Sequence, residues 1–293
     1  MSPKNKSIKT EKNLRLLNLI GVIATLLALA GTIAALIYAS KHLEDIERVA
    51  KQLPTKTIPT FPYNMGYINE ILKEANENKV DEVVIFTDVT AYGFFSRPKE
   101  WYEYRKNIKS IIDRNENNVK TKVNMICYDK ALAMNFIKWQ LEEYENNTKK
   151  CDSLLKVTKG KWNFLPDDLK SDGLYPLKKK DILDKFEKVK SFQELIGFID
   201  WFLSFDYENF RNLNKHEDNF TFEEIQTPSY FYMWQVGSQS AYNHSAIISF
   251  PMHKDTAAKK NESCFSTKDT DLLNVFADLR SSIKGKKLFR QCD

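Results

Sequence analysis

The chain has 293 residues, of which 42% are hydrophobic and 28% are charged, and its formal net charge is +5 at pH 7. Residues 1–15 hold five positive charges and one negative charge, so residues 16–293 carry a net charge of only +1. Proteins that hold a nucleic-acid backbone usually present a clustered basic surface. The charge balance gives no sign of a basic surface of that kind, and we expect no nucleic-acid partner.

An uncharged apolar segment follows the basic tail of residues 1–15. Residues 16–40 are 25 consecutive positions without a charged side chain, rich in Leu, Ile and Ala. At about 1.5 Å per helical residue, they are long enough to cross a hydrocarbon core of about 30 Å. A cleaved signal peptide has a shorter apolar region and a small-residue cleavage site. We therefore predict a single transmembrane helix that is retained as an anchor in a lipid bilayer.

The positive charges on the two sides of this segment predict its orientation. Five Lys or Arg residues lie in residues 1–15, and three lie in residues 41–51. The cytoplasmic flanks of membrane spans carry the excess of Lys and Arg. We expect a single-pass protein of the cell membrane with a cytoplasmic N-terminus and an exported domain.

Residues 41–62 connect the predicted anchor to the folded part of the chain. Apolar residues at helical spacing between Leu43 and Leu53 indicate a short helical stalk. Three prolines between Pro54 and Pro62 are typical of a stiff extended linker. Residues 63–293 then form one domain that is long enough for a sizeable hydrophobic core.

The first part of this domain alternates between helix and strand patterns. Apolar residues at helical spacing predict helices over 67–78 and 100–114, and short β-branched runs predict buried strands over 82–88 and 122–128. Helix, strand, helix, strand is the order of an α/β layer in which crossover helices connect parallel strands. The expected fold class is therefore α/β.

The pattern becomes helical from about residue 130. Helices are predicted over 131–145, 180–189 and 192–203, so residues 130–225 are interpreted as a helical insertion. In the last of these helices, aromatic residues at helical spacing suit either a ligand site or a packed core. The core is the simpler interpretation.

Strand patterns return after the insertion. Residues 230–236 and 245–250 flank a polar turn and predict a β-hairpin. Residues 263–267 predict a further strand, and residues 269–282 predict a closing helix that Asp269 caps together with Thr267. Parallel strands and a hairpin together predict a mixed sheet.

This order of elements resembles one repeat of the phospholipase D superfamily. In that family the first strand of the hairpin carries the motif H-x-K-x-x-x-x-D, in which the His is the covalent nucleophile and the Lys holds the phosphate. Aligning the motif's Asp with Gly237 places its His at Tyr230 and its Lys at Tyr232. All three chemical groups are therefore replaced, although the run from Glu262 to Asp269 fits the family's acidic residue, strand and final helix.

The resemblance covers residues 63–128 and 228–285. Family members with a single repeat pair two copies to complete a site across a two-fold axis. For this chain the resemblance implies a homodimer side by side on the bilayer, because tethering raises the effective concentration of the two copies.

One string of residues has the types that a polar site needs. It runs from Thr87 to Pro98 and follows the carboxyl end of the first predicted strand, where open α/β sheets place ligands. Asp88 suits an acid, a base or a cation ligand, and Arg97 suits an anion clamp. The candidate ligand-binding residues are Asp88, Tyr92, Ser96, Arg97 and Glu262.

The same string also suits an ordinary strand-to-helix loop, in which Gly93 takes an unusual φ and Pro98 opens the helix. The residue types favour this simpler interpretation. A nucleophile, a base and an oxyanion donor cannot be assigned together, so the catalytic residues stay unknown. The four cysteines show no C-x-x-C pairing, and we expect no metal and no cofactor.

Two functions are compatible with these features. The first is a membrane-anchored, non-catalytic domain that binds a small ligand or a partner protein for sensing or scaffolding. The alternative is a membrane-bound phosphodiesterase or related hydrolase whose site has been rebuilt around the candidate residues. Whether the chain is an enzyme is open at this point.

Overall fold

A computed structural model describes residues 55–78, 80–114, 120–148, 151–167, 169, 177–229, 231–237, 244–250 and 263–284. The predicted basic tail, span and stalk lie outside these residues, as does Glu262. None of the helices in the described ranges is both long enough and apolar enough to cross a bilayer.

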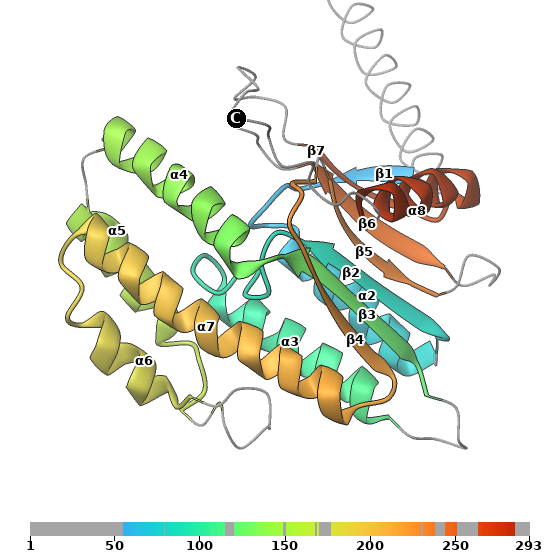
Figure 1. The fold of residues 1–293 in the computed structure, drawn as a ribbon, viewed down its shortest axis with the longest axis horizontal. Coiled ribbons are helices and arrows are strands. Elements are labelled where there is room, and N and C mark those ends of the chain that lie inside the picture. Colours follow the sequence, from blue (N-terminus) through green and yellow to red (C-terminus); the bar gives the residue numbers. More distant parts are fainter. Residues whose placement is uncertain are drawn as a thin grey trace, which may run out of the picture. The chain divides into compact units, whose positions relative to one another are not determined.

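The described residues form a seven-stranded mixed sheet with the order β1-β7-β6-β5-β2-β3-β4 (Figure 1). β2, β3 and β4 run parallel to one another, and the other neighbouring pairs are antiparallel. The predicted hairpin is confirmed as β5 and β6, and the predicted parallel pair as β2 and β3. The strands are β1 (Thr55–Ile58), β2 (Glu82–Thr87), β3 (Lys122–Tyr128), β4 (Phe220–Ile225), β5 (Tyr232–Val236), β6 (Ser245–Phe250) and β7 (Ser263–Thr267).

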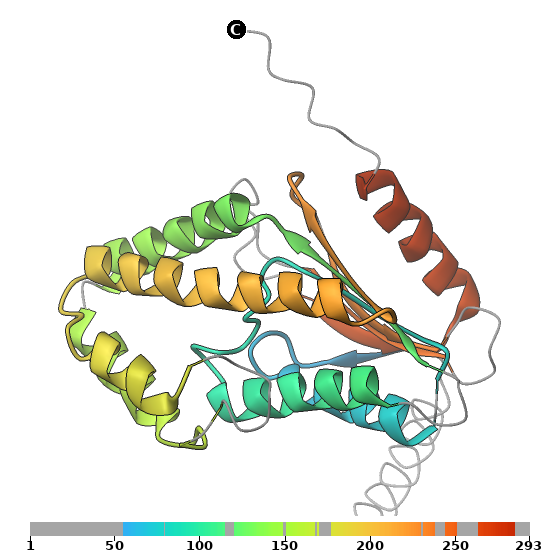
Figure 2. The same cartoon turned by 60° about the horizontal axis from the view of Figure 1, so that its bottom comes forward.

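Helices cover both faces of this sheet. α2 and α3 pack side by side on one face, and α8 packs on the other face over β5, β6 and β7 (Figure 2). Because both faces of the central strand are covered, all residues of β2 after Glu82 are buried. The helices are α2 (Met65–Asn78), α3 (Pro98–Asp113), α4 (Lys130–Thr148), α5 (Cys151–Trp162), α6 (Lys179–Phe186), α7 (Phe192–His216) and α8 (Thr270–Lys284).

Local signals explain where three of these helices begin. α3 begins at Pro98, whose fixed φ suits the first helical turn. α7 follows Ser191, whose Oγ accepts a hydrogen bond from the backbone N–H of Glu194. α8 follows Asp269, whose Oδ1 accepts a hydrogen bond from the backbone N–H of Leu272 at 3.1 Å. The predicted cap of the closing helix is therefore confirmed.

The predicted linker needs correction at residues 55–58. These residues form β1, which pairs antiparallel with β7 and buries Ile58. The run Thr-Lys-Thr-Ile is rich in the β-branched residues that strands favour. It lies at the edge of the sheet between two prolines, where the missing N–H groups of proline cost little. The described fold therefore includes residues before the predicted boundary at residue 63.

The predicted helical insertion needs correction at its end. Residues 220–225 form β4, which pairs parallel with β3. Glutamates are poor strand formers and obscure the pattern, but Phe220 and Phe222 alternate and both pack on Phe210 of α7. Within the insertion, α5 is an unpredicted helix whose pattern Gly160 weakens, and α7 extends well beyond its predicted end at residue 203.

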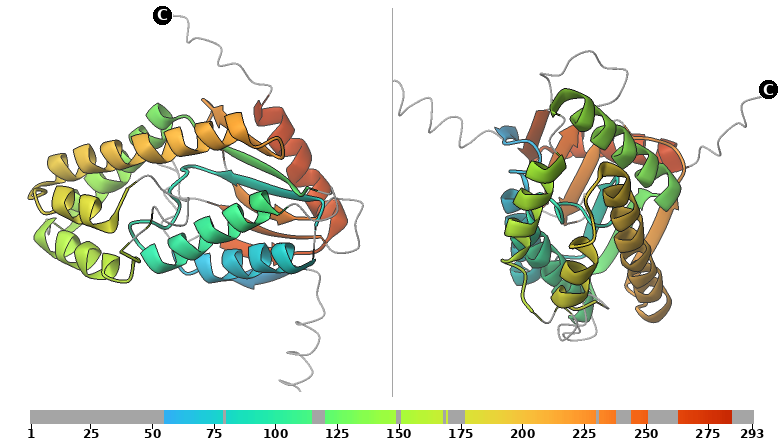
Figure 3. Two further views of the ribbon diagram at one scale, coloured as in Figure 1. Left: turned by 90° about the horizontal axis from the view of Figure 1, so that it is seen from below. Right: turned by 90° about the vertical axis from the view of Figure 1, so that its left-hand side faces the viewer.

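Helices α4, α5 and α6 and the first half of α7 lie together beyond the carboxyl ends of β2 and β3, and the second half of α7 packs on β4 (Figure 3). An aromatic cluster joins them to the loop after β2. The Phe94 ring stacks on Phe202 of α7 with centroids 3.8 Å apart, and it also contacts Trp101 and Trp162. Trp162 Nε1 donates a hydrogen bond to the Phe94 carbonyl oxygen at 3.2 Å. This cluster holds the loop between the sheet and the helices.

Candidate functional site

A cavity of about 470 Å³ lies between the sheet and the helices at the carboxyl end of β2. The loop after β2 and strands β5 and β6 line one side, and α4 and α7 line another. Most of the lining side chains are apolar, among them Ile137, Leu141, Ile199 and Leu203. This volume suits a small organic ligand, and the carboxyl ends of parallel strands are where α/β sheets bind such molecules.

Asp88 brings a carboxyl group to this apolar lining. It directly follows β2, and part of its surface faces the cavity. The Thr87 hydroxyl donates a hydrogen bond to Asp88 Oδ1 at 3.1 Å. Burial raises the pKa of Asp88 from 3.8 to about 6, against the opposing effect of hydrogen bonds from Thr87, Tyr232 and nearby backbone N–H groups. The charge of Asp88 therefore changes in the pH range just below neutral.

Tyr232 faces the same cavity from β5. Its hydroxyl lies close enough to Asp88 to lower the carboxyl pKa, but no hydrogen bond of regular geometry joins it to another group in the described ranges. Burial raises the pKa of Tyr232 well above its ordinary value, so the phenol stays protonated. A buried hydroxyl without a well-formed partner is unusual in proteins. We call Asp88 and Tyr232 together the polar corner of the cavity.

Aromatic rings surround the polar corner. The centroid of the Tyr92 ring lies 4.8 Å from that of Phe61 and 6.4 Å from that of Tyr232. The Tyr92 hydroxyl accepts a hydrogen bond from Asn64 Nδ2 at 3.1 Å, so it already has a partner. Phe61 is 41% exposed and therefore lies at the rim of the cavity. Tyr92 thus contributes chiefly its ring.

The backbone of the loop after β2 depends on Gly93. Its φ is +90°, and a Cβ atom built there would lie 2.8 Å from Met65 Cε. The unusual φ that the sequence predicts at this position is confirmed. Three residues later, the Ser96 Oγ is buried beside the cavity and has no hydrogen-bond partner within the described ranges. In this loop, Gly93 therefore sets the backbone conformation, and Ser96 contributes a hydroxyl group to the lining of the cavity.

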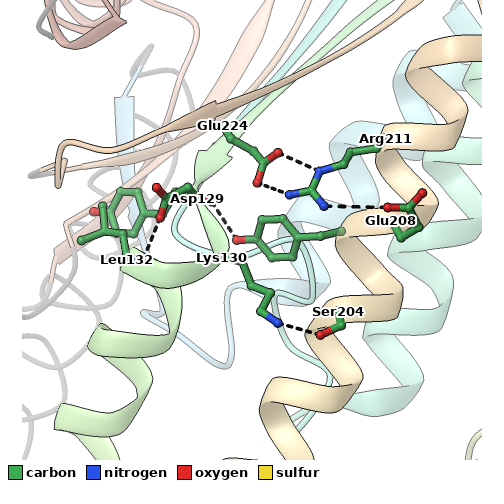
Figure 4. A network of polar contacts seen from close by, with 9 residues as sticks. Asp129, Lys130, Leu132, Ser204, Glu208, Arg211 and Glu224 are labelled. Carbon is green, nitrogen blue, oxygen red and sulfur yellow. Dashed lines mark hydrogen bonds and ion pairs between the residues drawn. The ribbon is translucent and has the colours of Figure 1, made fainter.

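Polar contacts position α4, which forms much of the apolar wall (Figure 4). The Asp129 carboxylate accepts a hydrogen bond at 2.7 Å from a backbone N–H in the first turn of α4. Lys130 Nζ donates a hydrogen bond to Ser204 Oγ of α7 at 2.7 Å. Farther along α7, Arg211 donates two hydrogen bonds, at 2.8 and 2.9 Å, to Glu224 of β4. These contacts tie the start of α4 and the edge of the sheet to the same helix.

The predicted site residues separate into two groups. Arg97 does not line the cavity, because its Nη1 pairs with Glu100 at 3.2 Å and its guanidinium lies 4.6 Å from the centre of the Tyr63 ring. Glu262 lies outside the described residues. The residues that the structure brings together at the cavity are Asp88, Tyr92 and Ser96.

Sequence reasoning misses the other parts of the site. In the sequence analysis, Tyr232 is noted only because it stands where the phospholipase D motif has its Lys. The wall from α4 uses Phe136, Ile137 and Leu141, which are the same residue types that fill a core. One usable signal is that the apolar residues of α4 are not gathered on a single narrow face, as they are in α2.

The described lining is mostly apolar and has few ionisable groups. It contains Asp88 and several hydroxyl groups, but no His, Cys, Lys or Arg. Nowhere in the described parts of the chain do three His, Cys, Asp or Glu side chains converge as metal ligands. Comparisons with models of protein families, with curated proteins and with solved structures gave no match, so the geometry of the cavity carries the functional interpretation.

Proposed function

We propose that this chain is a ligand-binding domain that takes a small, largely apolar molecule into the cavity at the end of β2. The observation that carries the proposal is the polar corner, in which the partly buried carboxyl of Asp88 and the buried hydroxyl of Tyr232 face a mostly apolar space of about 470 Å³. Apolar surface gains about 25 cal/mol per Å² when it leaves water, which supplies affinity. A few placed polar groups then fix the orientation of the ligand.

The uncharged segment at residues 16–40 supports a further part of the proposal, namely that the domain is anchored to the cell membrane. Ligand binding by a membrane-anchored domain suits sensing or scaffolding. The phospholipase D-like origin of the domain and its pairing into a homodimer stay hypotheses that rest on the order of the elements.

A phosphodiesterase is the alternative, and the charge of the cavity disfavours it. Enzymes that cleave phosphodiesters neutralise the phosphate with cationic side chains or metal ions. The side chains that line the described cavity include the carboxyl of Asp88 and no cation. Phosphodiester cleavage that is lost on Asp88→Ala substitution would reverse this preference.

A neutral fluorophore tests the proposed function. The full chain is placed in phosphatidylcholine nanodiscs, and N-phenyl-1-naphthylamine is titrated against it with empty nanodiscs as the blank. We expect saturable fluorescence enhancement at one site. Ile137→Trp places an indole in the cavity from α4 and should weaken binding about tenfold or more, a loss of about 1.4 kcal/mol.

The matched control is Asn135→Trp, which adds the same side chain to an exposed position of α4. This variant should bind the fluorophore as the natural chain does. Absence of a saturable signal, or equal binding by the two tryptophan variants, would contradict the proposal.

A further inference from the structure

We infer that the cavity selects organic cations, with an amine or ammonium head at Asp88 and an apolar body along α4 and α7. This choice of ligand class rests on the ligand-binding function proposed above. It follows from three properties of the described residues, namely the missing countercharge of Asp88, the aromatic rings beside it and the apolar walls beyond it.

The first property is the charge of the polar corner. The groups that act on Asp88 are its hydrogen-bond donors and its burial, and no cationic side chain in the described parts of the chain is among them. Asp88 is partly buried, and removing a carboxylate from water is costly unless an opposite charge or sufficient hydrogen bonds compensate it. A cationic ligand would supply the countercharge that the described protein groups do not.

The other titratable groups near Asp88 do not change the charge of the polar corner. They come from the loop after β2, from β3, from β5 and from α7, and burial raises the pKa of each well above its ordinary value. All of them are therefore uncharged at neutral pH, and the electrostatic sign of the corner is that of Asp88. These groups are Tyr92, Cys127, Tyr128, Tyr232 and Tyr207.

Aromatic rings add a second attraction for a cation. Phe61, Tyr92 and Tyr232 line the same cavity as Asp88, and their rings contact one another in sequence. The face of an aromatic ring carries negative electrostatic potential and attracts ammonium groups, and such rings recognise quaternary ammonium ligands in other proteins. A neutral or anionic head would gain nothing comparable from this arrangement.

The apolar walls decide between an organic cation and an inorganic one. Ile137, Leu141 and Leu154 lie along the cavity and offer no oxygen or nitrogen ligands. A small inorganic cation prefers several oxygen ligands and would leave these walls in contact with water. An alkyl or aryl body covers them and adds hydrophobic affinity.

Three probes that share one apolar body test the inference. They are 4-phenylbutylamine, 4-phenylbutan-1-ol and 4-phenylbutyrate, each measured by displacement of the neutral fluorophore from the full chain in phosphatidylcholine nanodiscs at pH 7.5. We expect the amine to bind about tenfold more tightly than the alcohol, and the carboxylate to bind more weakly than both. Equal binding of amine and alcohol would overturn the inference.

A pH series provides a test that needs no variant. An alkylamine has a pKa near that of a lysine side chain, about 10.4, and stays protonated throughout the series. Because ionised Asp88 is the binding form, affinity for the amine should fall as pH drops below 6, by about tenfold per unit well below that value. Affinity for the alcohol should stay constant, and a parallel fall for both probes would contradict the role of Asp88.

The variant Asp88→Asn removes the charge and keeps the shape. It should lose the preference for the amine and retain binding of the neutral fluorophore. Asp184→Asn, an exposed substitution of the same type on α6, should retain both. If Asp88→Asn keeps both its fluorophore binding and its preference for the amine, the cation inference fails while the proposed function stands. If the natural chain binds no fluorophore, the proposed function and the inference fail together.

Discussion

Two aspartates, Asp206 buried in the core and Asp88 partly buried at the cavity, have contrasting surroundings in this protein. Asp206 of α7 pairs with Arg105 of α3, with Oδ1 and Nη1 3.3 Å apart, and the guanidinium also lies over the Phe210 ring. Asp88 lies at the cavity, where the described residues provide no ion pair for it. Burial raises the pKa of both carboxyl groups, but a guanidinium opposes the shift for Asp206 alone.

The comparison teaches that burial of a carboxylate does not by itself indicate function. The pair between α3 and α7 satisfies charge within the fold, so its loss should destabilise the protein. In the proposed function the carboxylate at the cavity contacts a ligand, so its loss should cost binding and not folding.

The largest effect is expected for Asp206→Asn, which leaves the charge of Arg105 buried without its carboxylate. Removing one partner of a buried ion pair costs about 3–5 kcal/mol. The free energy of unfolding of the full chain, measured by urea titration with far-ultraviolet circular dichroism, should fall by that amount. Asp184→Asn is the control and should change it by less than about 0.5 kcal/mol. A loss below about 1 kcal/mol for Asp206→Asn would remove the structural role of the pair.

Asp88→Asn should raise the free energy of unfolding at neutral pH, whereas Asp206→Asn should lower it. The pKa of Asp88 is about 6 in the folded chain against an ordinary value of 3.8, so the folded state binds more protons between these values. The contribution of Asp88 to the free energy of unfolding therefore falls as pH rises from about 4 to 6. Above pH 6, ionised Asp88 lowers this free energy by about 2–3 kcal/mol. The asparagine avoids this cost.

The variant should therefore be more stable than the natural chain at pH 7.5, and the difference should shrink at pH 4.5. Urea titrations of both proteins at the two pH values measure it. An Asp88→Asn variant that is less stable than the natural chain at pH 7.5 would show that Asp88, like Asp206, stabilises the fold, and would contradict the contrast between the two residues.

Gly93→Ala tests the loop that carries Asp88 into the cavity. Its φ of +90° disfavours a side chain, and the new Cβ would press on Met65. We expect a loss of about 1–3 kcal/mol in the free energy of unfolding, together with weaker binding of the neutral fluorophore. Gly197→Ala is the matched control in α7, where the Cβ meets nothing within 4 Å, and it should stabilise the chain by about 0.5–1 kcal/mol. Equal effects of the two substitutions would contradict the strain at Gly93.

The smallest effect is expected for Arg97→Gln. The ion pair of Arg97 with Glu100 is partly exposed, since 34% of the Arg97 side chain is accessible, and such pairs contribute about 0.2–1 kcal/mol. Affinity for 4-phenylbutylamine and for 4-phenylbutyrate should not change, because Arg97 is not part of the lining. Selective loss of 4-phenylbutyrate binding would instead support the anion clamp that the sequence suggests.

Regular elements with strong local patterns are predictable from this sequence. β3 has the predicted bounds, and α2 and β2 differ from theirs by two residues or fewer. β1 and β4 are not predictable in the same way, because each is an edge strand whose pairing depends on a distant partner. β1 forms by pairing with β7, and β4 forms by pairing with β3. A single sequence gives little indication of such distant pairing.

The site is predictable in its polar part and not in its walls. Asp88 stands out because a carboxylate directly follows an apolar strand, and Tyr92 and Ser96 come with it in the same loop. The apolar part of the walls consists mainly of leucines, isoleucines and phenylalanines, which a sequence cannot divide between a filled core and the lining of a cavity. Arg97 lies outside the described lining and pairs with Glu100 in the first turn of α3, so a charged residue next to a site can also serve the helix that begins there.

The hydrogen bond between Trp162 and the Phe94 carbonyl has a consequence for measuring occupancy. Phe94 belongs to both the aromatic cluster and the lining of the cavity, and the Trp162 indole is fully buried against it. Displacement of this carbonyl on entry of a guest molecule would alter the polarity sensed by the indole ring. We therefore expect Trp162, one of five tryptophans in the chain, to report occupancy of the proposed binding cavity through a shift in its emission wavelength, without an added label.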